Sequence, residues 1–345
     1  MHSGRIRLGV VGTSSYAQTH IARLAKSPSA ELVAIAGRDV TKANGVAAEH
    51  GFGHVFGDYR HLIESKLVDA VVIVAPDDLH EEISLAAFAS GLHVLCEKPL
   101  STTAASARRM ARAAASSRLV NMSYFGLRFD RHHQYLRQLI ADGYVGQVRE
   151  AELSLSHGFF KHDAYNWRFD ASRGGGVIAD LGCYLFDQAR WLVGEVSAVI
   201  ASGRSFEARP HPAGHPYTPA HDSAAGLLTF TSGAHASFVM SVIADPGSGM
   251  QKNRVALQGS DARIELEHDF TGATLTGRRG RTEETLSIPA GFTSLDGDLE
   301  FLRAIATSSS ATPDFEDGWR VQQCVDAAIS STRSQSWIQI EEETL

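Results

Sequence analysis

The chain has 345 residues, which exceeds the usual size of a single hydrophobic core, so its length predicts two domains. Hydrophobic residues make up 43% and charged residues 21%, as in ordinary globular proteins and unlike disordered or fibrous chains. The 39 acidic and 32 basic residues are mixed along the chain and give a formal net charge of -7, so no basic stripe is available for nucleic acid. No window approaches the ~20 apolar residues that a membrane span requires. We expect neither nucleic acid nor a membrane as partner.

The cysteines indicate the cellular compartment. Cys96, Cys183 and Cys324 are an odd number without CxxC spacing, which favours reduced, buried thiols over a disulfide framework. Such thiols are typical of the cytosol, so we predict a cytoplasmic protein. The apolar run near the N-terminus is short and ends at Gly12, unlike the apolar core of a signal peptide.

The first third of the chain alternates short apolar runs with stretches of helical periodicity, which is typical of a parallel α/β sheet. The predicted strands are Arg7–Val11, Leu32–Ala36, His54–Phe56, Ala70–Ala75, His93–Cys96 and Leu119–Tyr124. The predicted helices cover Ala17–Leu24, the region around Ile83 and Ala87 up to Gly91, and Ser101–Ser117, which has serine and threonine at its start. We therefore predict an N-terminal domain over residues 1–121 with a doubly wound sheet.

The pattern changes after this point. A predicted helix, His132–Asp142, leads into Glu150–Ser156, where apolar and polar residues alternate as in a half-buried strand. Further predicted strands are Ala198–Gly203, Ala225–Phe230, Ala234–Ile243, Arg254–Gln258, Arg263–Glu267, Ala273–Thr276 and Thr285–Ile288. Further predicted helices are Asp180–Leu192, Leu295–Ala306 and Phe315–Ser331. Glycine-containing turns between strands favour antiparallel hairpins, so we predict an α+β domain over residues 122–345.

The first strand runs into Gly12-Thr13-Ser14-Ser15 and then into a helix. Such a turn directs backbone N–H groups and a helix N-terminus at a pyrophosphate, as in dinucleotide-binding folds. Ser14 stands where the usual fingerprint has its second glycine, and its Cβ hinders close approach of a phosphate. The alternative is an ordinary tight turn between a strand and a helix.

The end of the next strand bears on the choice of cofactor. Here Arg38 is followed by Asp39, and a guanidinium at this position favours the 2′-phosphate of NADP over the 2′-hydroxyl of NAD. The alternatives are that Arg38 stacks on the adenine or is solvated, and that Asp39 only starts the following helix. We predict NADP, with NAD as the alternative.

Two further segments close neighbouring strands. Ala75-Pro76 with His80 follows the fourth strand, and Glu97-Lys98-Pro99 follows the fifth, so both lie at the carboxyl edge of the sheet where ligands bind. Lys98 could bind a substrate hydroxyl and pass its proton while hydride moves to or from a nicotinamide. The alternative for an isolated lysine is a solvated surface charge.

At this point the sequence resembles the Gfo/Idh/MocA family of oxidoreductases over nearly its whole length. The matching segments are Gly12-Thr13-Ser14, Pro76 with His80, Glu97-Lys98-Pro99, Trp167-Arg168 and the run from Gly174 to Tyr184. The resemblance implies a Rossmann domain and a second domain with an open, mainly antiparallel sheet that covers the nicotinamide and often makes the oligomer contact, here a homodimer or homotetramer. It also implies that Lys98 relays a proton, that Glu97 orients the lysine, and that Asp180 lies beside the substrate.

Tyr184 stands where many members of that family carry the histidine that serves as acid–base partner. The pKa of a phenol is about 10, so Tyr184 can donate a proton but is a poor base at neutral pH unless Lys98 lowers its pKa. The alternative for Tyr184 is a core position on a helix, and for Asp180 it is a helix N-cap.

Pattern and resemblance together define the expected site. The expected cofactor contacts are Gly12, Thr13, Ser14, Ser15, Arg38, Ala75, Pro76, His80, Glu97, Lys98 and Arg168. The expected substrate contacts are Lys98, Trp167, Arg168, Asp180 and Tyr184, of which Lys98, Asp180 and Tyr184 are the expected catalytic residues. The predicted activity is hydride transfer between a nicotinamide and a carbinol or carbonyl of a sugar, polyol or cyclitol, which needs no metal. Two alternatives are a non-catalytic NADP-binding regulator and an NAD-assisted glycoside hydrolase.

Overall fold

The computed structural model describes residues 4–162, 164–245, 251–269, 271–341 and 343–345. The chain divides into two compact units. Unit 1 contains the residues up to Phe125, the later segment Leu295–Arg320 and Leu345, and unit 2 contains Gly126–Ser294 and Val321–Thr344. The sequence pattern predicts a single boundary after residue 121. In the structure, the later segment Leu295–Arg320 also belongs to unit 1.

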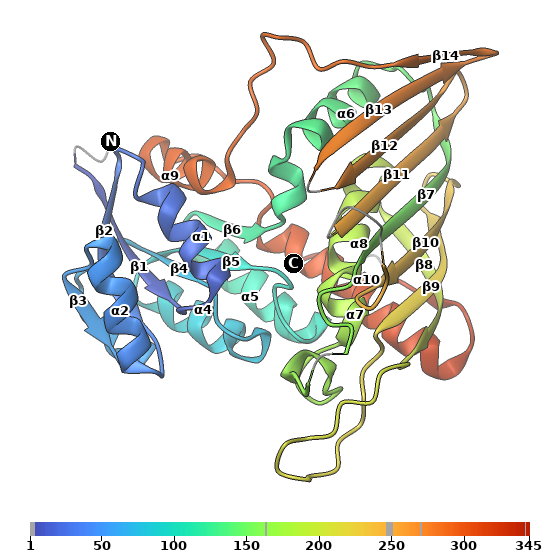
Figure 1. Cartoon of the computed structure of the whole chain (residues 1–345). Helices are drawn as coiled ribbons and strands as arrows, with labels where there is room; N and C mark the ends of the chain where they lie inside the picture. The colour runs from blue at the N-terminus through green and yellow to red at the C-terminus, as the bar shows by residue number, and fades with distance from the viewer. Residues whose placement is uncertain (1–3, 163, 246–250, 270, 342) are drawn as a thin grey trace. The chain divides into compact units, whose positions relative to one another are not determined.

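Unit 1 is built on a six-stranded parallel sheet with the order β3-β2-β1-β4-β5-β6 (Figure 1). Its strands are β1 (Ile6–Val11), β2 (Ala30–Ala36), β3 (His54–Phe56), β4 (Ala70–Ile73), β5 (His93–Glu97) and β6 (Asn121–Tyr124). This order reverses between β1 and β4, which is the switch point at which doubly wound sheets bind ligands. The predicted doubly wound sheet is confirmed.

Helices flank this sheet. They are α1 (Ser15–Leu24), α2 (Val40–His50), α3 (Tyr59–Glu64), α4 (His80–Ala89), α5 (Ala104–Ser117) and α9 (Gly297–Thr307), with a 3-10 turn at Asp77–Leu79. Thr103 caps α5 by accepting from the Ser106 N–H, which explains why this helix begins three residues later than predicted. All four residues of β4 are buried, because a parallel sheet is covered on both faces. Phe315 and Trp319 join the same core cluster, which explains why the late segment belongs to unit 1.

Unit 2 is built on a nine-stranded sheet with the order β14-β13-β12-β11-β7-β10-β9-β8-β15. Only the β7–β10 pair is parallel among the described strand pairs, and the rest are antiparallel. Its strands are β7 (Val148–His157), β8 (Val196–Arg204), β9 (Ser223–Phe230), β10 (His235–Ser241), β11 (Gln251–Gly259), β12 (Arg263–Asp269), β13 (Gly272–Arg279), β14 (Thr282–Thr285) and β15 (Ile338–Gln339). The predicted mainly antiparallel sheet is confirmed.

Helices cover one face of this second sheet (Figure 1). They are α6 (Arg131–Ala141), α7 (Gly176–Asp180) and α8 (Gly182–Leu192), with 3-10 turns at Gly126–Phe129 and Trp167–Phe169. The last helix, α10 (Phe315–Ser334), contributes its residues 321–334 to this unit. Along β10, Phe238 and Met240 are buried while Val239 between them is 52% exposed. The alternation shows that the opposite face of the sheet is uncovered.

Two predicted elements of unit 2 are wrong in detail. The single helix expected over Asp180–Leu192 is instead two helices that meet at Leu181, so Asp180 ends α7 and does not cap a helix. The strand expected at Thr285–Ile288 lies earlier, at Thr282–Thr285. Arg279 pairs with Thr282 across a two-residue turn, and Gly280 in that turn has a φ of +61°, so β14 begins directly after it.

The three cysteines are buried, as predicted. Among the described residues, no helix is both long enough and apolar enough to cross a membrane.

Candidate active site

The turn after β1 has the geometry of a dinucleotide turn. Gly12 has a φ of +128°, and a Cβ on it would lie 2.4 Å from the carbonyl oxygen of Val74, which follows β4. Glycine is therefore required where the ends of β1 and β4 approach each other. Ser14 is the N-cap of α1, because its Oγ accepts a hydrogen bond from the Ala17 N–H at 3.2 Å. Ser15 begins the helix and is exposed, so the N-terminus of α1 can receive an anion such as a pyrophosphate.

The end of β2 lies close to this turn. A Cβ on Gly37 would lie 2.8 Å from Cγ2 of Thr13, so the chain passes the turn in close contact. Asp39 accepts from the Lys42 N–H at 2.9 Å and caps α2, which confirms the helix-starting role considered for it. Arg38 is exposed, and no hydrogen bond or ion pair connects it to another residue in the described part of the chain. Its guanidinium is thus available to a ligand at the end of β2.

His80 holds two strand ends together and does not face solvent. Its side chain is fully buried, with Nε2 2.9 Å from the carbonyl oxygen of Ala75 and Nδ1 3.0 Å from that of Pro99. Both ring nitrogens are thus bonded to backbone, and the cofactor contact expected for His80 stays a prediction. Ala75 and Pro76 remain partly exposed at the edge. His80 fixes the segments after β4 and β5 relative to each other.

Lys98 follows β5 at the carboxyl edge of the sheet and is partly buried. Glu97 beside it is held at both carboxylate oxygens: Oε2 accepts from the Lys98 backbone N–H at 3.0 Å, and Oε1 lies 2.9 Å from Nε2 of His20. The other ring nitrogen of His20, Nδ1, lies 2.6 Å from Oδ1 of Asp298. The Lys98 segment is thus connected through Glu97 to α1 and α9.

Charge at His20 is set by its two acidic neighbours. Burial lowers the pKa of His20, but its hydrogen bonds with Asp298 and Glu97 outweigh that effect and raise the pKa to about 9. The Arg23 guanidinium continues the network by donating to the Tyr124 hydroxyl at 2.6 Å and to Asp298 at 3.5 Å. We call His20, Glu97 and Asp298 the unit 1 histidine network.

Neither His20 nor Asp298 was predicted as a site residue from the sequence. One signal was present: His20 lies on the face of α1 that also carries the buried residues Ala17, Ile21 and Leu24, so a titratable group occupies a core position. Asp298 has no comparable signal, because it is 278 residues away from His20 and lies in the first turn of a helix, where acidic residues are common.

In unit 2, the glycine run before Asp180 serves close packing. Gly176 has a φ of +58°, and a Cβ on it would lie 2.3 Å from the carbonyl oxygen of His221. A Cβ on Gly174 would lie 2.9 Å from the Cα and the carbonyl oxygen of Arg168. The run therefore places α7 directly against the Trp167-Arg168 turn and the residues before β9.

The residues predicted to contact substrate in unit 2 share this neighbourhood. Trp167 and Arg168 form a 3-10 turn in which the Arg168 guanidinium lies 4.6 Å from the Trp167 ring centroid. Asp180 ends α7, and Tyr184 lies in the first turn of α8. All four are partly exposed. Lys98 belongs to unit 1 and these four residues to unit 2, so their predicted meeting at one substrate stays a prediction.

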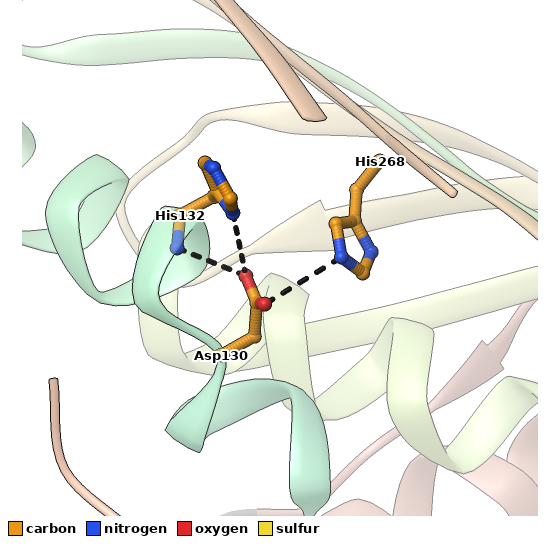
Figure 2. Close-up of side chains that lie close together, drawn as sticks. All are labelled: Asp130, His132 and His268. Carbon is orange, nitrogen blue, oxygen red and sulfur yellow. Dashed lines mark hydrogen bonds and ion pairs between the residues drawn. The ribbon is translucent and has the colours of Figure 1, made fainter. Parts of the chain in front are cut away.

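A second group of titratable residues lies in unit 2, where α6 begins beside β12. Figure 2 shows Asp130 between His132 and His268, and these are the one set of three potential metal ligands within 4.8 Å of one another in the described part of the chain. Oδ1 of Asp130 already accepts from the backbone N–H groups of His132 and His133 and faces Nδ1 of His133 at 2.8 Å. Asp130 is thus explained as the cap of α6, and the absence of a metal stays a prediction.

Comparison with known proteins decides the family. Residues 6–125 match an oxidoreductase family with an NAD-binding Rossmann fold, and residues 133–265 match the GFO/IDH/MocA C-terminal domain. The chain belongs to the Gfo/Idh/MocA family. Its membership confirms the predicted resemblance and shows that it is an oxidoreductase of an NAD-binding family.

Similar members of the Gfo/Idh/MocA family are named as dehydrogenases. Levoglucosan dehydrogenase of Pseudarthrobacter phenanthrenivorans is 28% identical over 341 residues, covering 85% of each chain. D-xylose 1-dehydrogenase (NADP(+)) 2 of Haloferax volcanii is 28% identical over 345 residues, covering 96% of this chain and 99% of the relative. A solved structure of a levoglucosan dehydrogenase in complex with NADH and L-sorbose has a TM-score of 0.87 and 25% identity, covering 98% of this chain and 99% of the other.

Proposed function

We propose that this protein transfers hydride between a nicotinamide dinucleotide and a carbinol or carbonyl carbon of a sugar, polyol or cyclitol, with Lys98 as the proton-relaying group. The observation that carries the proposal is the placement of Lys98 at the carboxyl edge of β5, with the neighbouring Glu97 held at both of its oxygens. The names of the relatives, levoglucosan dehydrogenase and D-xylose 1-dehydrogenase, support a polyhydroxy substrate.

The residues at the edge of unit 1 fit a dinucleotide. Gly12, Thr13, Ser14 and Ser15 would hold the pyrophosphate, because Gly12 allows the close approach of β1 and β4 and the helix N-terminus after the turn is exposed. Ala75 and Pro76 would line the path toward the nicotinamide. When bound, the dinucleotide supplies the group that accepts or donates hydride.

The chain's own residues would bind the substrate and move a proton. Nζ of Lys98 would bind the reacting oxygen and take its proton during oxidation, or return it during reduction. Asp180 and Tyr184 would bind the same oxygen or its neighbour, with the Tyr184 hydroxyl as donor in the reductive direction. Trp167 and Arg168 would offer an aromatic face and hydrogen-bond donors to a ring with several hydroxyls.

We also propose a preference for NADP. The exposed Arg38 guanidinium after β2 supports it, because such a group pairs bidentately with a 2′-phosphate. One relative is named as NADP-dependent, whereas a similar structure holds NADH, so NAD is the alternative that direct binding measurements would decide.

Oligomer formation is a further part of this proposal. Leu227 and Val239 are 46% and 52% exposed on the uncovered face of the unit 2 sheet, which supports contact between copies of the chain. We propose a homodimer or homotetramer through this face, and the molar mass in solution from light scattering tests it.

The decisive experiment combines a substrate panel with substitution of Lys98. The protein with NADP or NAD is offered sugars, anhydrosugars, inositols and their keto forms, and nicotinamide absorbance is followed. Lys98→Met should lower kcat by about 1,000-fold while the Kd for the dinucleotide changes by about 2-fold or less, because the proton relay is lost and the pyrophosphate turn is kept.

Lys26→Met, which removes an exposed lysine of the same unit, is the matched control and should leave turnover unchanged. Near-normal turnover in Lys98→Met would remove the assigned role of Lys98. No change in nicotinamide absorbance with any compound of the panel would favour an NADP-binding regulator. Cleavage of a glycosidic bond without net reduction of the nicotinamide would favour an NAD-assisted glycoside hydrolase.

A further inference from the structure

The unit 1 histidine network requires a positively charged His20. Both ring nitrogens face carboxylate oxygens, at 2.9 Å for Glu97 and 2.6 Å for Asp298. An ionised carboxylate only accepts hydrogen bonds, so each ring nitrogen must carry a proton to satisfy it. The side chain of His20 is 2% exposed, and therefore water does not replace either partner. His20 is an imidazolium cation buried between two anions.

The same contacts determine where Glu97 lies. One oxygen of Glu97 is held by His20, and the other accepts from the Lys98 backbone N–H at 3.0 Å. The backbone of Lys98 is thereby fixed through a chain of two charge-assisted hydrogen bonds that begins in α1. Glu97 itself is buried, so its carboxylate oxygens need these hydrogen-bond partners in place of water.

Asp298 anchors the network from the opposite side. Its side chain is fully buried in the first turn of α9, and Oδ2 lies 3.5 Å from the Arg23 guanidinium. The ring of Tyr124 packs edge-on against His20, with ring centroids 4.5 Å apart, and its hydroxyl accepts from Arg23. The titratable groups that face His20 are thus Glu97 from β5, Asp298 from α9, and Tyr124 from β6, with Arg23 one turn away on α1.

We propose that His20 and Asp298 are positioning residues for Lys98: the imidazolium holds the Glu97 carboxylate, and Glu97 holds the lysine at the place where the substrate proton is exchanged. This inference rests on the proposed function of Lys98. It assigns a role in turnover to a residue in the helix after the dinucleotide turn and to one in the late segment of the chain.

Removal of the cation has two consequences for catalysis. First, Glu97 loses a partner and Lys98 loses its fixed backbone, so we expect kcat to fall by about 10- to 100-fold in His20→Gln. Second, the positive charge that offsets the Glu97 carboxylate next to Lys98 is lost, which stabilises the lysine as ammonium and raises its pKa. Because oxidation requires the neutral amine, the rise of kcat with pH should move upward by about half a unit.

The experiment measures kcat, KM and the dinucleotide Kd against pH for the wild type, His20→Gln and Asp298→Asn. Asp298→Asn keeps an acceptor oxygen for Nδ1 of His20, so it should retain more turnover than Asp298→Ala. The matched control is His133→Gln, which removes a buried histidine of unit 2 that is bonded at both ring nitrogens. A structural defect alone would lower the melting temperature in both histidine variants without moving the kcat–pH curve.

Expected and contrary outcomes are distinct. A lower kcat with a shifted pH curve in His20→Gln, and an unshifted curve in His133→Gln, supports the inference. An unchanged kcat and pH curve in a folded His20→Gln protein overturns it while the function of Lys98 stands. Absence of wild-type turnover removes the proposed function, and this inference falls with it.

A measurement on the wild-type protein covers the case in which His20→Gln does not fold. Nitrogen-15 NMR of the histidine side chains at pH 7.5 should show His20 with both ring nitrogens protonated. A neutral His20 ring at that pH overturns the inference without any substitution.

Discussion

His20 of unit 1 and His133 of unit 2 are both buried and each faces a carboxylate, but their hydrogen-bond networks end at different groups. In unit 1, His20 lies between Glu97 and Asp298, and Glu97 continues to Lys98 at the carboxyl edge of the sheet. In unit 2, Nδ1 of His133 faces Asp130 at 2.8 Å and Nε2 faces the amide oxygen of Asn253 at 2.7 Å.

The His133 network connects only elements of unit 2 among the described residues. The Asn253 side chain exchanges hydrogen bonds with Gln188 of α8 and donates to the Ser154 carbonyl of β7. Asp130 caps α6, so the contacts of His133 connect α6, α8 and the sheet. Burial and a double hydrogen bond therefore do not by themselves indicate a catalytic role; the group at the far end of the network decides. The network of His133 connects elements within unit 2, whereas that of His20 leads to Lys98, for which we propose a reactive role.

The largest expected effect that separates the two networks is on stability at alkaline pH. The pKa of His20 is raised from 6.5 to about 9 in the folded protein, with burial opposing the hydrogen bonds from Asp298 and Glu97. A raised pKa contributes stability that is complete below about pH 6.5 and lost as pH rises through about 9, on the order of 3 kcal/mol.

Chemical denaturation between pH 6.5 and 10 checks this expectation. The free energy of unfolding should fall with pH in the wild type and in the control His54→Gln, which removes an exposed histidine. The fall should be smaller in His20→Gln, where the buried His80, whose pKa is raised to about 10, still contributes its own loss. An equal fall in all three proteins would mean that His20 does not bind the extra proton.

A smaller effect is expected from Asp130. Asp130→Ala removes the acceptor of two backbone N–H groups at the start of α6 and a partner of His133, which should destabilise the protein by about 2 kcal/mol. Asp130→Asn keeps an acceptor oxygen and should recover more than half of this loss. Thermal unfolding measures both variants. If Asp130→Ala shifted the kcat–pH curve as His20→Gln should, the distinction between the two networks would be lost.

The smallest effect concerns the cofactor. Arg38→Ala should leave stability unchanged, because no described residue is bonded to its side chain, and should lower the ratio of NADP to NAD affinity by about 10-fold, equivalent to about 1.4 kcal/mol. Fluorescence titration with each dinucleotide gives the ratio, and Arg118→Ala serves as a control far along the chain. An unchanged ratio of the two affinities would mean that Arg38 does not contact the 2′-phosphate, and NAD would then be the better candidate.

Local patterns predicted much of the fold. Strand, turn and helix around Gly12 could be predicted because the steric demand of a close approach leaves few residue choices. The break at Leu181 and the early start of β14 could not, because the first depends on packing of α7 against the residues before β9 and the second on a two-residue turn at Gly280.

The predictability of the candidate site divides in the same way. Lys98 and Glu97 were predicted, because a charged pair at the end of a buried strand is a local signal. His20, which binds Glu97, and Asp298, which binds His20, were not predicted. Asp298 meets His20 through a contact between α1 and α9, and no sequence spacing indicates that contact. The two backbone carbonyls that bind the His80 ring were not predicted either, because Pro99 lies 19 residues further along the chain.

The position of Asp298 has a consequence for the order of synthesis. The ribosome has synthesised all six strands of the parallel sheet once it reaches Tyr124. The second carboxylate that His20 faces is added only at residue 298, and the core residues Phe315 and Trp319 are added after it. Until residue 298 is added, His20 therefore lacks one of its two carboxylate partners. Unit 1 is thus completed by a segment that is synthesised near the end of the chain.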